Sequence, residues 1–283
     1  MNFGPKSHVA RLQLAFLLLS LLIVASALSS LRSWLEISAI GERASDYWVV
    51  PILSFLLFIQ RRSSIFADSR FTPAALVLVI AGLGINAAST RTCDVSAALL
   101  GVVIAIIGAF VACFGTQACQ RAIFPLALLL LAIPLPLVAW RQAVEWLQHG
   151  SAAVLQFILV LLHVSFHRAD LQFQFSNLTI EIAPECSGIR SSYALLVITL
   201  LLSYLWVHSF WRRALLVAAV IPLVLIKNGI RIATISLLAE KVDPAFIDSP
   251  LHHRGGFVFF SLVLALEGAF CWLLRRGEIQ AGR

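Results

Sequence analysis

One segment of this chain sets a cysteine where it could act as a nucleophile. Residues 183–190 read APECSGIR and come directly before a long apolar run, so we expect Cys186 at the start of a helix. A thiol attacks only as its thiolate, and its free pKa of about 8.5 must fall for attack at neutral pH. Unpaired N–H groups at a helix start favour an anion, and Arg190, four residues on, is expected on the same helix face. A small buried residue at the helix start is the alternative, which the polar flanking residues disfavour.

Two later segments supply the cation and the proton carrier that such a cysteine needs. The run NGIR brings Asn228 and Arg231 into an apolar stretch, where a cation costs at least about 2.5–3.5 kcal/mol and normally faces the bundle interior. We expect Arg231 to hold an oxyanion or a substrate carboxylate, and Asn228 to orient it. The run HHRGGF offers His252 or His253 as general base for the thiol and acid for the leaving amine. If the segments meet, the chain carries the parts of a cysteine peptidase or transpeptidase.

Transmembrane helices are expected to position these residues. Of the 283 residues, 60% are hydrophobic and 12% are charged, whereas a soluble domain has about a quarter charged. Several uncharged stretches of roughly twenty residues are long enough to span about 30 Å of hydrocarbon. We therefore expect an all-α polytopic membrane protein, with residues 1–283 forming a single integral membrane domain. The net charge of +7 then reflects basic residues that flank the spans and face anionic lipid, and it does not indicate nucleic-acid binding.

About eight transmembrane helices are expected from the uncharged runs. An N-terminal four-helix part covers residues 12–120, and a catalytic part covers residues 121–275. The expected spans are residues 12–31, 47–60, 71–90, 95–120, 122–140, 191–211, 214–239 and 256–274. Residues 142–163 are more polar, so we expect them to form an amphipathic helix that lies along the membrane interface before the cysteine.

A small β-hairpin is expected between that helix and Cys186, because residues 171–182 alternate with period two around a turn at residues 176–177. One face holds Leu171, Phe173, Phe175, Leu178, Ile180 and Ile182, and the other holds Gln172, Gln174, Thr179 and Glu181. An open hairpin leaves edge groups unpaired in lipid, so it must lie outside the bilayer.

Paired basic residues set the expected orientation. The pairs at residues 61–62, 212–213 and 275–276 mark cytoplasmic ends by the positive-inside rule. With the N-terminus inside and eight spans, the cysteine, Arg231 and the histidines reach the outer face. We expect a protein of the cytoplasmic (inner) membrane whose active site faces the periplasm or exterior.

At these motifs the sequence resembles the exosortase/archaeosortase family of membrane-embedded cysteine transpeptidases. The resemblance rests on ECSGIR at Cys186, on NGIR at Arg231, and on a histidine four residues before Gly256. It extends to the run IPLP and to the hairpin before the cysteine, and it covers most of residues 120–275. Gly256 is followed by phenylalanine, where the family usually has tryptophan.

The resemblance implies cleavage of a C-terminal sorting signal of the PEP-CTERM type, often in connection with exopolysaccharide production. The implied partners are membrane lipid and exported proteins with a tail of short motif, transmembrane helix and basic residues. Cys186 would be the nucleophile, Arg231 the transition-state or substrate cation and His252 the catalytic histidine, with His253 as the competing choice. Arg190 and Asn228 would support them, without a cofactor or metal.

Two other functions compete with this interpretation. In a non-catalytic transporter or assembly scaffold of the exopolysaccharide pathway, Lys227, Arg231 and Glu267 would line a polar path. Transporters usually show repeats with matching broken helices, and none is evident here. A glycosyl- or phospho-transferase would require outward paired carboxylates with a metal, for which Asp243 and Asp248 are the only candidates.

Overall fold

The computed structural model describes residues 5–39, 47–67, 69–243, 245–246 and 256–281. By internal contacts the chain forms two compact units, Met1–Leu137 and Val138–Arg283. We expected the N-terminal part to end at residue 120, so the first unit is longer by the helical segments that follow. Each unit has its own hydrophobic core.

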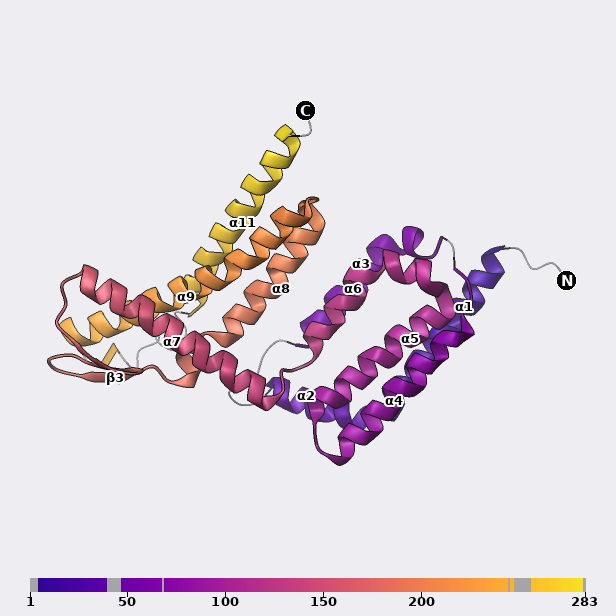
Figure 1. The fold of residues 1–283 in the computed structure, drawn as a ribbon, viewed down its shortest axis with the longest axis horizontal. Coiled ribbons are helices and arrows are strands. Elements are labelled where there is room, and N and C mark those ends of the chain that lie inside the picture. The colour runs from indigo at the N-terminus through magenta and orange to yellow at the C-terminus, as the bar shows by residue number, and fades with distance from the viewer. Residues whose placement is uncertain (1–4, 40–46, 68, 244, 247–255, 282–283) are drawn as a thin grey trace. The chain divides into compact units, whose positions relative to one another are not determined.

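The first unit is built from helices that pack through small residues and aromatic rings (Figure 1). Its elements are α1 (Pro5–Ser26), α2 (Leu28–Ala39), α3 (Val49–Ile65), η1 (Pro73–Ala75), α4 (Leu76–Arg91), α5 (Val95–Arg121), α6 (Ile123–Leu128) and η2 (Leu129–Ala132). Helices α4 and α5 approach closely at Gly82, which has no Cβ. A Cβ there would lie 2.4 Å from the Gly101 carbonyl oxygen. Phe110 and Phe114 of α5 are buried at the centre of an aromatic cluster that includes Phe16.

The second unit carries all three chemical motifs and packs four long helices with a small sheet. Its elements are α7 (Leu137–Leu161), β1 (His167–Ala169), β2 (Gln172–Gln174), β3 (Thr179–Glu181), η3 (Pro184–Ser187), α8 (Ile189–Trp206), α9 (Phe210–Lys241) and α11 (Gly256–Ala281). Helices α8, α9 and α11 share a core that includes Leu195, Val220 and Val263. The sheet packs on α7 and α9, where Phe173, Leu155 and Ile232 meet in one buried cluster.

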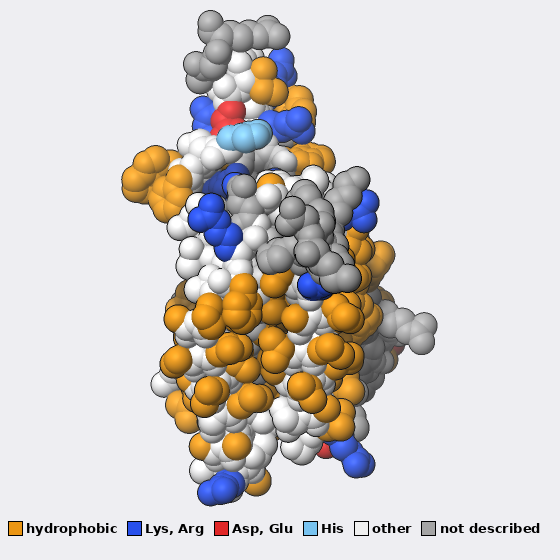
Figure 2. All heavy atoms as spheres, turned by 90° about the vertical axis from the view of Figure 1, so that its right-hand side faces the viewer, with side chains coloured by type: hydrophobic (Ala, Val, Ile, Leu, Met, Phe, Trp, Pro, Cys, Tyr) orange, Lys and Arg blue, Asp and Glu red, His pale blue; other side chains and the backbone are white. Residues whose placement is uncertain are grey.

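The all-α polytopic membrane fold is confirmed. In the described part of the chain, seven helices are long and apolar enough to cross a membrane: α1, α4 with η1, α5, α7, α8 with η3, α9 and α11. Figure 2 shows hydrophobic side chains gathered on the face that it draws, with Lys and Arg side chains above and below them. This distribution fits a surface in contact with lipid.

One expected span is shorter than predicted, and two segments are longer. Helix α3 covers Val49–Ile65, 17 residues, where a span was expected at residues 47–60. The apolar helix expected at residues 122–140 covers only Ile123–Ala132. Pro134 and Pro136 follow it and cannot continue a regular helix. The segment expected at residues 142–163 begins earlier, at Leu137, and its 25 residues meet the length and hydropathy of a span. Two of its polar residues, Gln148 and Ser151, are buried inside the unit.

The hairpin before Cys186 is confirmed, with one strand more than expected. Strands β2 and β3 pair antiparallel with Phe173 opposite Ile180, and β1 adds a third strand on the other side of β2. The turn closes at the expected place, where Phe175 N donates to Leu178 O at 2.8 Å. Phe173, Phe175 and Ile182 are buried, whereas the four polar residues between them in the alternation are exposed.

Candidate active site

A short turn, separate from the following helix, carries Cys186. The cysteine lies in η3, and Gly188 then takes the left-handed conformation at φ +78° before α8 starts at Ile189. Left-handed backbone is strained for residues with a Cβ, and a Cβ on Gly188 would also lie 3.2 Å from the Asn228 side chain. Gly188 therefore breaks the helical spacing that led us to place Arg190 on the face of Cys186. Arg190 is exposed at the second position of α8 and is not among the residues that line the cavity described below.

Asn228 of α9 fixes this turn from inside the unit. Its fully buried side-chain amide donates one hydrogen bond to the Cys186 carbonyl oxygen at 2.6 Å and another to the Ser151 hydroxyl of α7 at 3.0 Å. We expected Asn228 to orient Arg231, but the hydrogen bonds show that it joins α7, α9 and the cysteine turn. Ser151 was missed from the sequence, because a serine in an apolar helix gives no signal of its own.

The neighbouring glycine explains how Asn228 reaches α7. A Cβ on Gly229 would lie 2.4 Å from Val154 Cγ1 and 2.6 Å from Val154 Cβ, so only glycine permits this crossing of α7 and α9. A Cβ on Gly150 of α7 would meet only the end of the Leu225 side chain, at 2.7 Å, a contact that this flexible side chain can relieve. The run NGIR thus combines an anchor for the cysteine turn, a close helix crossing and a cation.

A second tether joins α9 to the same turn. The buried Lys227 ammonium, one residue before the asparagine, donates to the Ser191 hydroxyl. That hydroxyl donates to the Gly188 carbonyl oxygen at 2.9 Å, and Ser192 donates to it at 2.8 Å. Two consecutive residues of α9 therefore hold the carbonyl groups on either side of Ser187, which limits the movement of Cys186.

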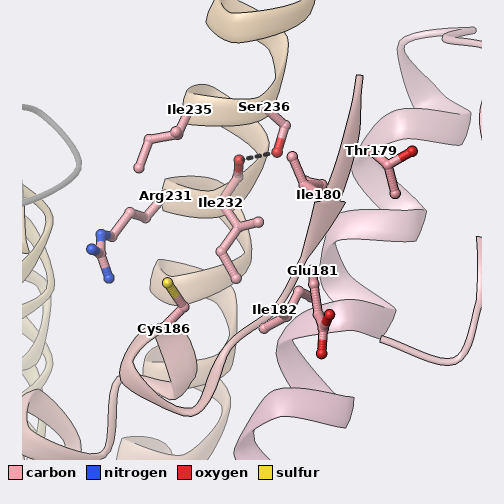
Figure 3. A pocket seen from close by; sticks show the side chains of 9 residues that line it. All are labelled: Thr179, Ile180, Glu181, Ile182, Cys186, Arg231, Ile232, Ile235 and Ser236. Atoms are coloured by element: carbon pink, nitrogen blue, oxygen red, sulfur yellow. Dashed lines mark hydrogen bonds between the residues drawn. The ribbon is translucent and has the colours of Figure 1, made fainter. Parts of the chain in front are cut away.

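Cys186 and Arg231 line one cavity of about 190 Å³ (Figure 3). The sulfur and the guanidinium point toward the same space beside α9, and the charge of Arg231 is near enough to act on the thiol. The cavity is bounded by Ile232, Ile235 and Ser236 of α9 on one side and by β3 and Ile182 on the other. A thiol and a cation thus reach one cavity from positions more than forty residues apart in the sequence.

The remaining candidate residues divide into those outside the described residues and those with other contacts. His252, His253 and Asp248 lie outside the described residues. The Asp243 carboxylate accepts from Ala245 N at 2.8 Å, as in a local turn. Within the described ranges, no group of three His, Cys, Asp or Glu side chains is placed to hold a metal ion.

Glu267, the acidic candidate for a polar path, is enclosed between two helices. It is fully buried in α11 and accepts a hydrogen bond from Thr199 of α8 at 3.2 Å. This bond joins α8 and α11 at Thr199, in the middle of α8 and away from the cysteine turn that precedes Ile189.

The fold and the site define a polytopic membrane protein with a cysteine and an arginine in one cavity beside a small sheet. A family model described as transmembrane exosortase matches residues 34–267. The chain therefore belongs to the transmembrane exosortase family. No match was found among curated proteins or among solved structures.

Proposed function

We propose that this protein is a cysteine transpeptidase or peptidase that cleaves a C-terminal sorting signal from exported proteins. The observation that supports the proposal most is the cavity shared by Cys186 and Arg231. Family membership supports an exosortase-like function. The substrate would be a tail of short motif, apolar helix and basic residues, of the PEP-CTERM type.

The chemistry assigned to these side chains is covalent catalysis through a thioester. The Cys186 thiolate attacks the scissile carbonyl carbon, and the Arg231 guanidinium stabilises the negative charge that develops on the carbonyl oxygen. The C–N bond then breaks, and the leaving amine takes a proton from His252 or His253. Water or an acceptor amine or hydroxyl attacks the thioester, which returns the thiol and releases the acid, amide or ester.

The basic ends of the helices support an outward-facing site. Arg212 of α9 donates to the Leu274 carbonyl of α11 at 3.0 Å, so the basic pairs at residues 212–213 and 275–276 lie at one end of the unit. Cys186 lies at the opposite end of α8, whose 18 residues span about 27 Å. Because the positive-inside rule assigns the basic end to the cytoplasm, the cysteine would face the exterior of the cytoplasmic membrane.

Processing of a tail-bearing reporter tests the proposal. The reporter is an exported protein of the same cell that carries the motif, helix and basic residues, and the readout is loss of its tail. We expect Cys186→Ala to abolish tail release while the protein still inserts in the membrane. The exposed Cys93, changed to alanine, is the matched control and should leave release unchanged. Undiminished release by Cys186→Ala would refute the proposed nucleophile.

A further inference from the structure

The cavity beside Cys186 runs along the free edge of strand β3. Four consecutive residues, 179 to 182, line it. One face of a strand presents only alternate residues, so a wall of consecutive residues is the edge of the strand. In the described part of the chain, β3 pairs with β2 alone, which leaves that edge without a neighbouring strand.

The hydrogen-bonding pattern between β2 and β3 shows which backbone groups of β3 point away from β2. Ile182 N donates to Leu171 O at 3.1 Å and Phe175 N donates to Leu178 O at 2.8 Å, so Leu178 and Ile180 direct their N–H and C=O groups to β2, and Ile182 directs its N–H there. In an antiparallel ladder the residues between them direct N–H and C=O to the opposite side. These residues are Thr179 and Glu181. The Glu181 carbonyl accepts from Ala183 N at 3.1 Å, and the other outward groups have no backbone partner among the described residues.

We propose that the substrate segment that contains the scissile bond binds as an extended strand added to the edge of β3. This inference rests on the proposed function and names how the same site holds its substrate. An extended segment would bond to the N–H and C=O of Thr179 and to the N–H of Glu181, and its alternate side chains would meet the apolar wall of Ile232 and Ile235. The same addition brings its backbone beside Cys186, which lines the same cavity.

Strand addition also fits the chemistry of a sorting tail. A peptide bond inside a helix has its carbonyl oxygen engaged and is hidden by neighbouring turns, whereas an extended backbone exposes each carbonyl to a nucleophile. The occupant is therefore the extended segment just before the apolar helix of the tail. Backbone hydrogen bonds hold this segment whatever its side chains are, and selectivity among side chains comes from Ile232 and Ile235.

A proline at the outward position tests the backbone bond. Thr179→Pro removes the outward N–H. It leaves the hydrogen bonds between β3 and β2 in place, because that N–H points away from β2. Thr179→Val keeps the N–H and removes only the hydroxyl. With the tail-bearing reporter, we expect Thr179→Pro to process at least about tenfold more slowly than Thr179→Val, which corresponds to the loss of a well-formed hydrogen bond.

The opposite edge of the sheet offers a matched control. Arg168 of β1 lies opposite Phe173, so its N–H points outward from the far edge, and Arg168 is not among the cavity residues. The Arg168 side chain donates to Gln156 of α7 and lies over the Phe173 ring, so Arg168→Ala, which removes the same contacts, is the reference. Arg168→Pro should process like Arg168→Ala. Equal rates for the two variants at Thr179, or an equal loss for Arg168→Pro relative to Arg168→Ala, would overturn strand addition. Tail release that survives Cys186→Ala would instead overturn the proposed function, so the two failures are distinct.

Disulfide trapping gives a second test that does not depend on a proline. Thr179→Cys is combined with Cys186→Ala, and single cysteines are placed at successive positions of the reporter segment before its apolar helix. Strand addition predicts trapping at alternate positions, since alternate side chains share one face. Trapping at all positions or at none would contradict it. A disulfide between two copies of Thr179→Cys, unaffected by the reporter, would assign the edge to self-association.

Discussion

The change Asn228→Ala tests whether a single buried amide positions the proposed nucleophile, Cys186. It removes the donors that reach Cys186 O at 2.6 Å and Ser151 Oγ at 3.0 Å. Each hydrogen bond contributes about 0.5–1.5 kcal/mol, so the two bonds contribute about 1–3 kcal/mol to the free energy of unfolding. One of the lost bonds holds the turn that carries Cys186. We therefore expect the thiol to move from its position in the cavity that it shares with Arg231.

The first unit contains a matched control for this loss. Asn86 is also buried and donates to Ser30 Oγ at 3.0 Å and to Ala98 O at 3.1 Å. Asn86→Ala therefore removes the same pair of partner types, a hydroxyl and a carbonyl, and should lower stability by a similar amount. Asn86 lies in the unit that does not contain Cys186.

Two measurements on the purified variants separate positioning from stability. Thermal unfolding in detergent should show similar decreases for Asn86→Ala and Asn228→Ala. At a temperature where both remain folded, only Asn228→Ala should process the reporter at least about tenfold more slowly, equivalent to about 1.4 kcal/mol in the barrier. Equal processing rates for the two variants would refute a special role for Asn228.

Two glycines near the site yield further predictions. Gly229→Ala should lower the free energy of unfolding by about 1–3 kcal/mol, because its Cβ would meet α7 at 2.4 Å; Gly268→Ala has open space and should leave thermal unfolding unchanged or raise it. A stable Gly229→Ala would disprove the close crossing of α7 and α9. Gly188→Ala should cost about 1–2 kcal/mol, since its backbone is left-handed at φ +78°. It should also change the alkylation rate of Cys186 by a thiol reagent, and an unchanged rate would mean that the turn tolerates a Cβ.

Much of the second unit could be predicted from local patterns. Period-two alternation located the hairpin and its buried face correctly, because Phe173 and Ile182 face α7 and α9 while Gln172 faces water. Long uncharged runs located most spans for an equally simple reason, the need to match the hydrocarbon thickness. Residues 142–163 were set apart because polar side chains interrupt their apolar run, and two of these side chains, Gln148 and Ser151, are buried inside the unit. Gln148, for example, donates to the Ile182 carbonyl that leads to the cysteine turn.

The site was predictable only in part, because its residues are joined by tertiary contacts. Cys186 and Arg231 were singled out by residue type and are placed at one cavity. The partnership of Asn228 with Ser151 depends on a helix crossing that no spacing within one segment reveals. Arg190 was misplaced because the i, i+4 rule assumes an unbroken helix, and Gly188 interrupts it. The roles of His252 and His253 remain predictions, since both lie outside the described residues.

Isolation of the covalent intermediate tests the central proposal most directly. The enzyme and its tail-bearing reporter are mixed, quenched in acid after a short time and digested, and peptides that contain Cys186 are analysed by mass spectrometry. The proposed mechanism predicts a thioester between Cys186 and the new C-terminus of the reporter, which hydroxylamine cleaves. Tail release at the normal rate with no such adduct on Cys186, or with an adduct on another residue, would contradict it.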